Sequence, residues 1–215
     1  MDYGPAGYPT ARIETMRIYE PAQDRFFDSL VEFFSSFAGL MTGLRAHQEG
    51  SAKAYGTHQA IVIYGTHATG VALSFFPHFF LDALIKNTWP TEIRLAEFPL
   101  ATLQGSQSGS ITSVTRIAAA LLESSFIRYY EQQKEAVSLK FGADVKGWPS
   151  EWNFARVVRN AFAHRGAIKF DNPKAQSVHW RNLSYSRNDN GRIVTFTDIA
   201  AVEIILLMED IDGLL

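Results

Sequence analysis

The residues best suited to chemistry lie close together in residues 150–165, which the sequence predicts as a helix ending at Arg165. At about 100° per residue, Arg156, Asn160 and His164 share one side of this helix, and Arg159 lies beside them. Guanidinium groups match phosphate oxygens, and histidine suits proton transfer near neutral pH. The opposite side is apolar and is expected to face the core: Phe154, Val157, Val158, Ala161 and Phe162. The outward side therefore predicts a polyanion site with a proton-transfer group.

A purely structural interpretation of these residues stays open. A cationic His164 in the last turn would stabilise the helix C-terminus. Arg156 and Arg159 would pair with surface carboxylates for little free energy. The order of the residues, more than their types, favours a functional site.

The run Arg159-Asn160-Ala161-Phe162-Ala163-His164 resembles the Arg-x4-His signature of the HEPN superfamily, in which a polar residue such as Asn often follows the Arg. The resemblance covers at most about residues 24–166. It implies a mainly α fold, an up-and-down helical bundle, here followed by a small C-terminal antiparallel β hairpin and a final helix. A long helix expected from Ile111 and a polar break before Ser150 agree with it.

The resemblance also implies an activity. Such domains pair as homodimers through this helix, and many are metal-independent ribonucleases. On that pattern His164 is the general base or proton shuttle for the ribose 2′-hydroxyl, and Arg159 binds the scissile phosphate and stabilises charge in the transition state. Asn160 orients His164 or the phosphate. Arg156 and Arg165 are expected to bind RNA phosphates. The products would be a 2′,3′-cyclic phosphate and a 5′-hydroxyl.

The predicted protein is thus a cytoplasmic endoribonuclease and a candidate stress or defence toxin, acting on RNA as a homodimer through the Arg159–His164 helix. It needs no cofactor and no metal, and an antitoxin-like protein is a candidate partner. The first alternative is a non-catalytic HEPN dimerisation or RNA-binding module. The second is an unrelated helical protein that carries the motif by chance.

The rest of the chain must position this helix. Residues 1–22 are expected to form an N-terminal arm, and residues 23–215 a single domain in which the hairpin is an appendage. Residues 54–88 are compatible with helix or strand, apart from a helical pattern near Pro77. Outside the motif, helices are expected over 23–47, 111–141 and 199–210, the last capped by Asp198, and the hairpin over 167–197 with its turn at 188–191.

Composition limits the other possibilities. The net charge is −2, but residues 116–170 carry nine Lys or Arg against five Asp or Glu, which favours a local anion site. The chain has no cysteine, which excludes disulfides, iron–sulfur clusters and Cys-based zinc sites. The start lacks a signal-peptide pattern. The most apolar window, Val71 to Ile85, is too short to cross a bilayer, so no membrane association is expected.

Two further groups have two interpretations each. Trp180 and Tyr185 could stack RNA bases, although packing of the hairpin onto the helices is favoured. The acidic residues of the C-terminal segment could hold a metal, but a solvated helix face is favoured: Glu203, Glu209, Asp210 and Asp212.

Overall fold

The computed structural model describes residues 15–49, 55–102, 113–172 and 175–215. Within these ranges the chain forms five α-helices, a four-stranded antiparallel sheet and a two-stranded sheet. The fold is therefore α+β, and the prediction of a mainly α bundle is wrong. The helical elements are α1 (Phe27–Glu49), α2 (Pro77–Ile85), α3 (Ser113–Phe141), α4 (Ser150–Ala163) and α5 (Ala201–Asp212), with short 3-10 turns η1 (Leu100–Thr102), η2 (Val145–Gly147) and η3 (Arg187–Asp189).

The four-stranded sheet is the part that the sequence did not reveal. Its order is β1-β4-β3-β2, and all neighbours are antiparallel. Residues 72–75 of β3 and 95–98 of β4 are buried one after another, so these stretches lack the alternation that marks a half-buried strand. The edge strand β1 lies in the expected N-terminal arm. The bounds are β1 (Thr15–Tyr19), β2 (Ile61–Tyr64), β3 (Val71–Phe75) and β4 (Ile93–Pro99).

An aromatic cluster joins the sheet to α1 and α2. The ring of Phe34 from α1 lies 4.6 Å from that of Phe75 at the end of β3, and 5.4 Å from that of Phe80 in α2. All three side chains are buried. The phenylalanine-rich segments 26–37 and 75–80 therefore pack on one core. Pro77 stands in the first turn of α2, where its missing N–H costs no helical bond.

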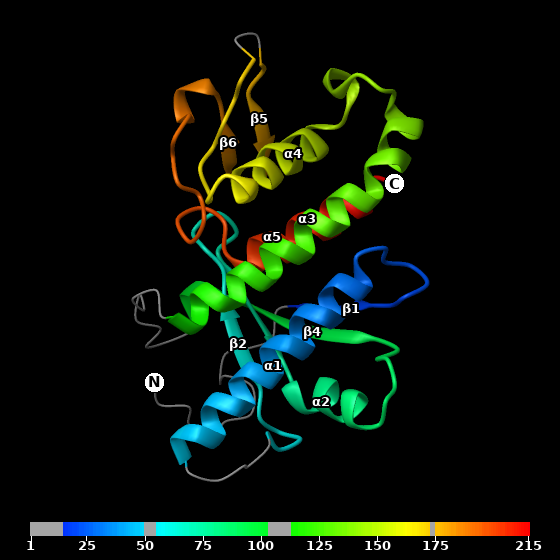
Figure 1. Ribbon diagram of the computed structural model, residues 1–215, viewed down its shortest axis with the longest axis vertical. Helices are drawn as coiled ribbons and strands as arrows, with labels where there is room; N and C mark the ends of the chain where they lie inside the picture. Colours follow the sequence, from blue (N-terminus) through cyan, green and yellow to red (C-terminus); the bar gives the residue numbers. More distant parts are fainter. Residues whose placement is uncertain (1–14, 50–54, 103–112, 173–174) are drawn as a thin grey trace.

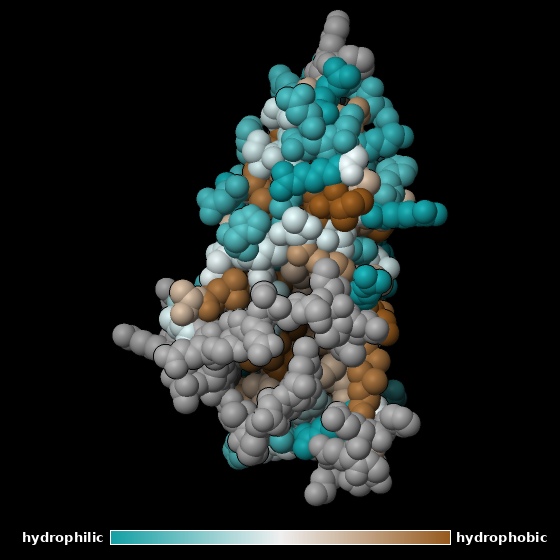
Figure 2. All heavy atoms as spheres, turned by 90° about the vertical axis from the view of Figure 1, so that its left-hand side faces the viewer, coloured by the Kyte–Doolittle hydropathy of each residue, from teal (hydrophilic) through white to brown (hydrophobic). Residues whose placement is uncertain are grey.

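The C-terminal sheet is a short hairpin, β5 (Val178–Trp180) and β6 (Leu183–Tyr185). Its two-residue turn is Arg181-Asn182, with Arg181 at a φ of 48°. A turn does form at residues 188–191, as η3 and the two residues after it, but it does not join the strands of this hairpin as predicted. It leads the chain back to Ala167, which pairs with Ile193. Hydrophilic side chains gather at this end of the molecule (Figure 2).

Helix α5 occupies the centre of the molecule. It contacts α3 and α4 on one side and β2 and β3 on the other (Figure 1). Ile199, Val202, Ile205 and Leu206 are buried, as predicted. Asp198 is not the helix cap, since Ala200 holds that position. The buried Asp198 carboxylate instead accepts hydrogen bonds from Arg192 and Tyr185.

The acidic residues of α5 do not form the predicted solvated face. Glu203 is 0% exposed, and Asp212 is 6% exposed. The Glu203 carboxylate accepts hydrogen bonds from the Thr66 amide at 2.7 Å, the Thr69 hydroxyl at 2.5 Å and the Ala200 amide at 3.0 Å. It therefore ties the β2–β3 loop to the start of the central helix.

Candidate functional site

Helix α4 carries the motif and is held on three sides. The five residues predicted to face the core are all buried, and so are Trp152 and Ala155. The Trp152 indole donates to the Ile211 carbonyl at 3.0 Å, and the Phe154 ring stacks on Tyr185 at 5.2 Å. Contacts with α3, α5 and β5 thus leave only one narrow side of α4 open.

The start of α4 differs from the prediction. The residue at the N-cap is Pro149, not Ser150. The Ser150 hydroxyl donates instead to the His179 carbonyl of β5 at 2.8 Å. The Asn153 amide donates to the carbonyls of Val145 and Trp148, at 2.8 and 3.0 Å. These bonds fix the segment before α4 and the hairpin against its first turn.

Arg159 has two partners on the open side. Its Nη2 lies 2.8 Å from the Glu131 carboxylate of α3, and its Nη1 donates to the Asn160 side-chain oxygen at 3.2 Å. Asn160 therefore orients the guanidinium, whereas the motif predicted that it would orient His164 or a phosphate. Because Arg can only donate, Asn160 must present its oxygen to Arg159 and keep both amide N–H donors for another acceptor.

His164 lies at the end of the helix. It is the C-cap residue, and its backbone N–H donates to the Ala161 carbonyl at 2.9 Å. Its ring is exposed and makes no hydrogen bond or ion pair with the described residues. The predicted helix end at Arg165 is thus two residues too far, because Arg165 already has a φ of 61°. The predicted left-handed stop at Gly166 is confirmed by its φ of 79°.

Arg156 and Asn160 line a groove of about 440 Å³ between α4 and residues 169–172 and 175–178. Lys146 and Lys169 also line it, and Lys169 pairs with Asp171 at 3.2 Å. Arg156 forms no hydrogen bond or ion pair within the described part of the chain, and its Nε is buried without a partner. A buried guanidinium N–H without an acceptor is uncommon, so this groove is the best candidate for an anion site.

The predicted site residues therefore fall into two groups, one at the groove and one at the end of α4. Arg156 and Asn160 share the groove, and Asn160 also contacts Arg159. His164 and Arg165 are exposed at the helix end and do not line the groove. Sequence reasoning missed three contributors, Glu131, Lys146 and Lys169. The only signal for the two lysines is that they belong to the basic stretch of residues 116–170.

The hairpin aromatics have a packing role. Trp180 and Tyr185 are 2% and 1% exposed. The Trp180 indole donates to Asp210 at 2.8 Å, and the Arg181 guanidinium bonds to the same carboxylate at 2.9 and 3.2 Å. The preferred prediction, that these rings pack the hairpin onto the helices, is confirmed.

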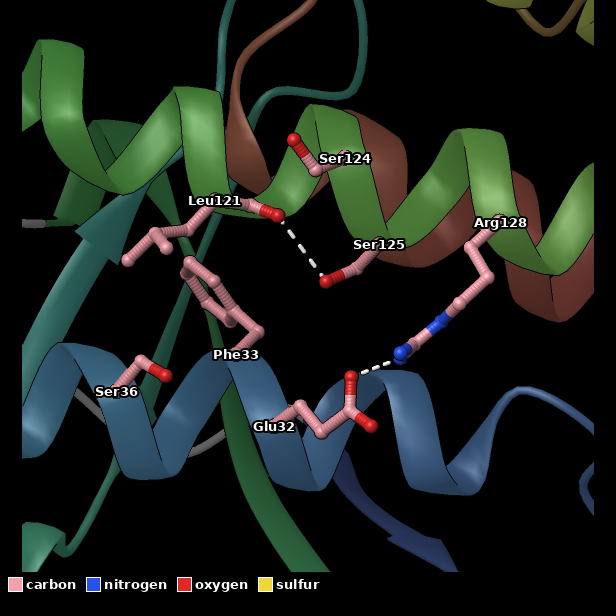
Figure 3. A pocket seen from close by; sticks show the side chains of 7 residues that line it. All are labelled: Glu32, Phe33, Ser36, Leu121, Ser124, Ser125 and Arg128. Carbon is pink, nitrogen blue, oxygen red and sulfur yellow. Dashed lines mark hydrogen bonds and ion pairs between the residues drawn. The ribbon is translucent and has the colours of Figure 1, made fainter.

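A second hollow, of about 280 Å³, lies between α1 and α3 (Figure 3). Glu32 of α1 forms an ion pair with Arg128 of α3 across it. The Ser125 hydroxyl turns back to the Leu121 carbonyl at 3.0 Å. The charges of this hollow compensate each other, so it lacks the unpaired cation that distinguishes the groove beside α4.

Within the described residues, no three His, Asp or Glu side chains are arranged to hold a metal ion. None of the helices in these ranges is long and apolar enough to cross a membrane. Comparison of the chain with protein-family models, curated proteins and solved structures finds no match.

Proposed function

We propose that the protein is an endoribonuclease that needs no metal, acts in the cytoplasm, and uses Arg159, Asn160 and His164 on the open side of α4. The observation that carries the proposal is Arg156, a guanidinium without an acceptor beside the Arg159–Asn160 pair. An unpaired cation there favours a polyanion as ligand. The exposed imidazole of His164, one turn beyond Asn160, supplies the proton-transfer group.

The reaction is transesterification within the RNA. His164 takes the proton of the 2′-hydroxyl, the 2′-oxygen attacks the adjacent phosphorus, and the bond from phosphorus to the 5′-oxygen breaks. Arg159 stabilises the charge that develops on the phosphate oxygens. The leaving 5′-oxygen takes up a proton, which gives a 2′,3′-cyclic phosphate and a 5′-hydroxyl.

This chemistry favours a homodimer. In an in-line displacement the attacking and leaving oxygens lie on opposite sides of the phosphorus. One imidazole cannot contact both oxygens, and His164 is the one histidine in residues 150–165. A second copy docked through this side would bring another His164 to protonate the leaving oxygen. Light scattering should then give twice the mass of one chain.

Cleavage of a labelled single-stranded RNA in the presence of EDTA tests the activity. The parent protein should cleave the RNA, and His164→Ala should bind it without cleavage. The DNA strand of the same sequence is the matched control, because it lacks the 2′-hydroxyl and should stay intact. Retained cleavage by His164→Ala, or cleavage of the DNA strand, would contradict the mechanism.

A non-catalytic RNA-binding module is the second candidate function. The observation that favours it is the Glu131 carboxylate, which already neutralises Arg159. A parent protein that binds RNA but leaves it intact under all conditions would support this alternative.

A further inference from the structure

The groove beside α4 is lined by three cationic side chains, Lys146, Arg156 and Lys169, and by one carboxylate, Asp171. Asn160 offers its two amide N–H groups, since its oxygen is bonded to Arg159. Arg156 offers a guanidinium without a partner, and Lys146 forms no ion pair within the described ranges. The Asp171 carboxylate is paired with Lys169. The net positive charge of this lining therefore favours a negatively charged occupant that accepts hydrogen bonds.

The size of the groove suggests more than a lone ion. Its volume of about 440 Å³ falls in the range of about 300–1,000 Å³ that holds small organic ligands. A phosphate together with its sugar fits this description. The polar lining also provides hydrogen-bond partners for hydroxyl groups.

The groove and the reactive residues are connected through Asn160. This side chain lines the groove and contacts Arg159 at the same time. Along the helix axis, Arg156 and His164 are about 12 Å apart at about 1.5 Å per residue. One RNA strand can therefore place one phosphate in the groove and another near His164.

We propose that this groove is a subsite for a flanking phosphate of single-stranded RNA, separate from the scissile phosphate, held by Lys146, Arg156 and the Asn160 amide. This inference rests on the proposed function for the identity of the ligand as RNA. The groove would then select for substrate length. An RNA long enough to place a phosphate in the groove is held in register with His164, whereas a dinucleotide with one phosphate is not.

Binding tests the subsite directly. The probe is a labelled RNA of about 12 nucleotides, within the usual footprint of single-strand binding sites. The proteins carry His164→Ala so that the RNA is not cut, with or without Lys146→Ala and Arg156→Gln. Each lost phosphate contact should lower the slope of log affinity against log salt by about 0.7. We expect the double substitution to lower the slope by about 1.4 and weaken binding at least tenfold.

The matched control is Lys86→Ala, which removes the same charge at the C-cap of α2, and α2 lies far from α4 (Figure 1). The Lys86 side chain is 70% exposed, and its partner is Asp82. An unchanged slope in the groove variants, or an equal loss in Lys86→Ala, would overturn the subsite. Lys146→Ala alone repeats the test with a residue outside the α-helices, in case Arg156→Gln impairs folding.

Cleavage separates this inference from the proposed function. On the parent background, Lys146→Ala should lower kcat/KM for the long RNA relative to a dinucleotide, by about fivefold or more for one lost contact at low salt. Equal losses on both substrates would overturn a separate subsite. If the parent cleaves neither substrate but the groove variants still lose affinity and salt slope, the nuclease proposal fails and the subsite stands as an RNA-binding site.

Discussion

The Arg159 guanidinium is bonded to the Glu131 carboxylate, with 2.8 Å between Nη2 and Oε1. The two residues come from different helices, and both side chains are partly exposed, at 30% and 41%. An ion pair at this exposure contributes about 0–1 kcal/mol, which a phosphate can readily exceed. If the proposed function holds, Glu131 competes with an RNA phosphate for Arg159.

Glu131→Gln is expected to tighten RNA binding by about threefold. The reason is that RNA no longer has to break an ion pair worth about 0.7 kcal/mol to reach Arg159. The measurement is fluorescence anisotropy with the His164→Ala protein, so that the RNA stays intact. Glu135→Gln makes the same change of charge one turn further along α3, at an exposed residue without an ion pair in the described ranges. Equal effects of the two substitutions would show that only net charge matters.

Gly166→Ala is expected to destabilise the fold by about 2–3 kcal/mol, since it combines a strained backbone with a steric clash. Gly166 has a φ of 79°, and a Cβ there would lie 2.5 Å from the Thr195 hydroxyl. Gly142 has a φ of 95°, but a Cβ there would meet nothing within 4 Å. Gly142→Ala should therefore lower the free energy of unfolding only through backbone strain, by about 1 kcal/mol. Urea unfolding of both variants gives the comparison, and equal losses would exclude the clash with Thr195.

Glu203→Ala is expected to cost on the order of 3 kcal/mol, because it leaves the buried donors of Thr66, Thr69 and Ala200 without an acceptor. Glu203→Gln should cost less but remain destabilising, since one oxygen becomes a donor that faces other donors. Chemical denaturation measures both. Glu135→Ala on the surface of α3 is the control and should change stability by less than about 0.5 kcal/mol. A Glu203→Ala protein of parental stability would contradict the bonding described here.

Glu123→Gln is expected to stabilise the protein at pH 7. Burial raises the pKa of Glu123 above its ordinary range, and the hydrogen bond from the Thr195 hydroxyl offsets this only in part. A raised folded-state pKa means that the group favours folding below its unfolded pKa and that this contribution is lost as pH rises through the folded pKa. The advantage of Gln should therefore shrink as pH falls toward about 4.3, the ordinary pKa of Glu.

Urea unfolding of the Glu123→Gln and parent proteins at pH 7 and pH 4 measures this difference. Glu135→Gln serves as the exposed counterpart and should show no pH-dependent gap. A stability difference that grows on acidification would contradict the direction of the Glu123 shift.

The helices were predictable because their apolar residues repeat over many turns. Residues 150–163 formed the predicted helix with the predicted buried face, and the long helix before it began within two residues of its expected start. The sheet was not predictable in the same way. Residues 72–75 of β3 and 95–98 of β4 are buried one after another, so the alternation that identifies a half-buried strand is absent there.

The hairpin turn shows how a strong local signal misleads. Asn188 to Gly191 contains the residues typical of hairpin turns, yet it forms η3 and the turn after it. The true turn has Arg181 at positive φ, which few sequences would suggest. The Arg181–Asp210 ion pair and the buried Trp180 hold this turn in place. Both contacts join residues about thirty positions apart, which local patterns do not show.

The site was predictable as one face of one helix but not as an assembly. Spacing placed Arg156, Arg159 and Asn160 on the open side of α4, and the structure agrees. The Glu131 partner lies 28 residues away on another helix, and the groove is closed by a segment after the motif. Such contacts depend on how elements pack, and no single-helix pattern contains that information.

The central position of α5 has a consequence for biosynthesis. Translation delivers the sheet, α3, α4 and the hairpin before the helix that fills the space between them. Until residues 201–212 emerge from the ribosome, Trp152 lacks its acceptor at Ile211, and α4 lacks one of its three supports. A nascent chain therefore cannot hold Arg156, Arg159 and Asn160 in their finished arrangement until α5 has been made.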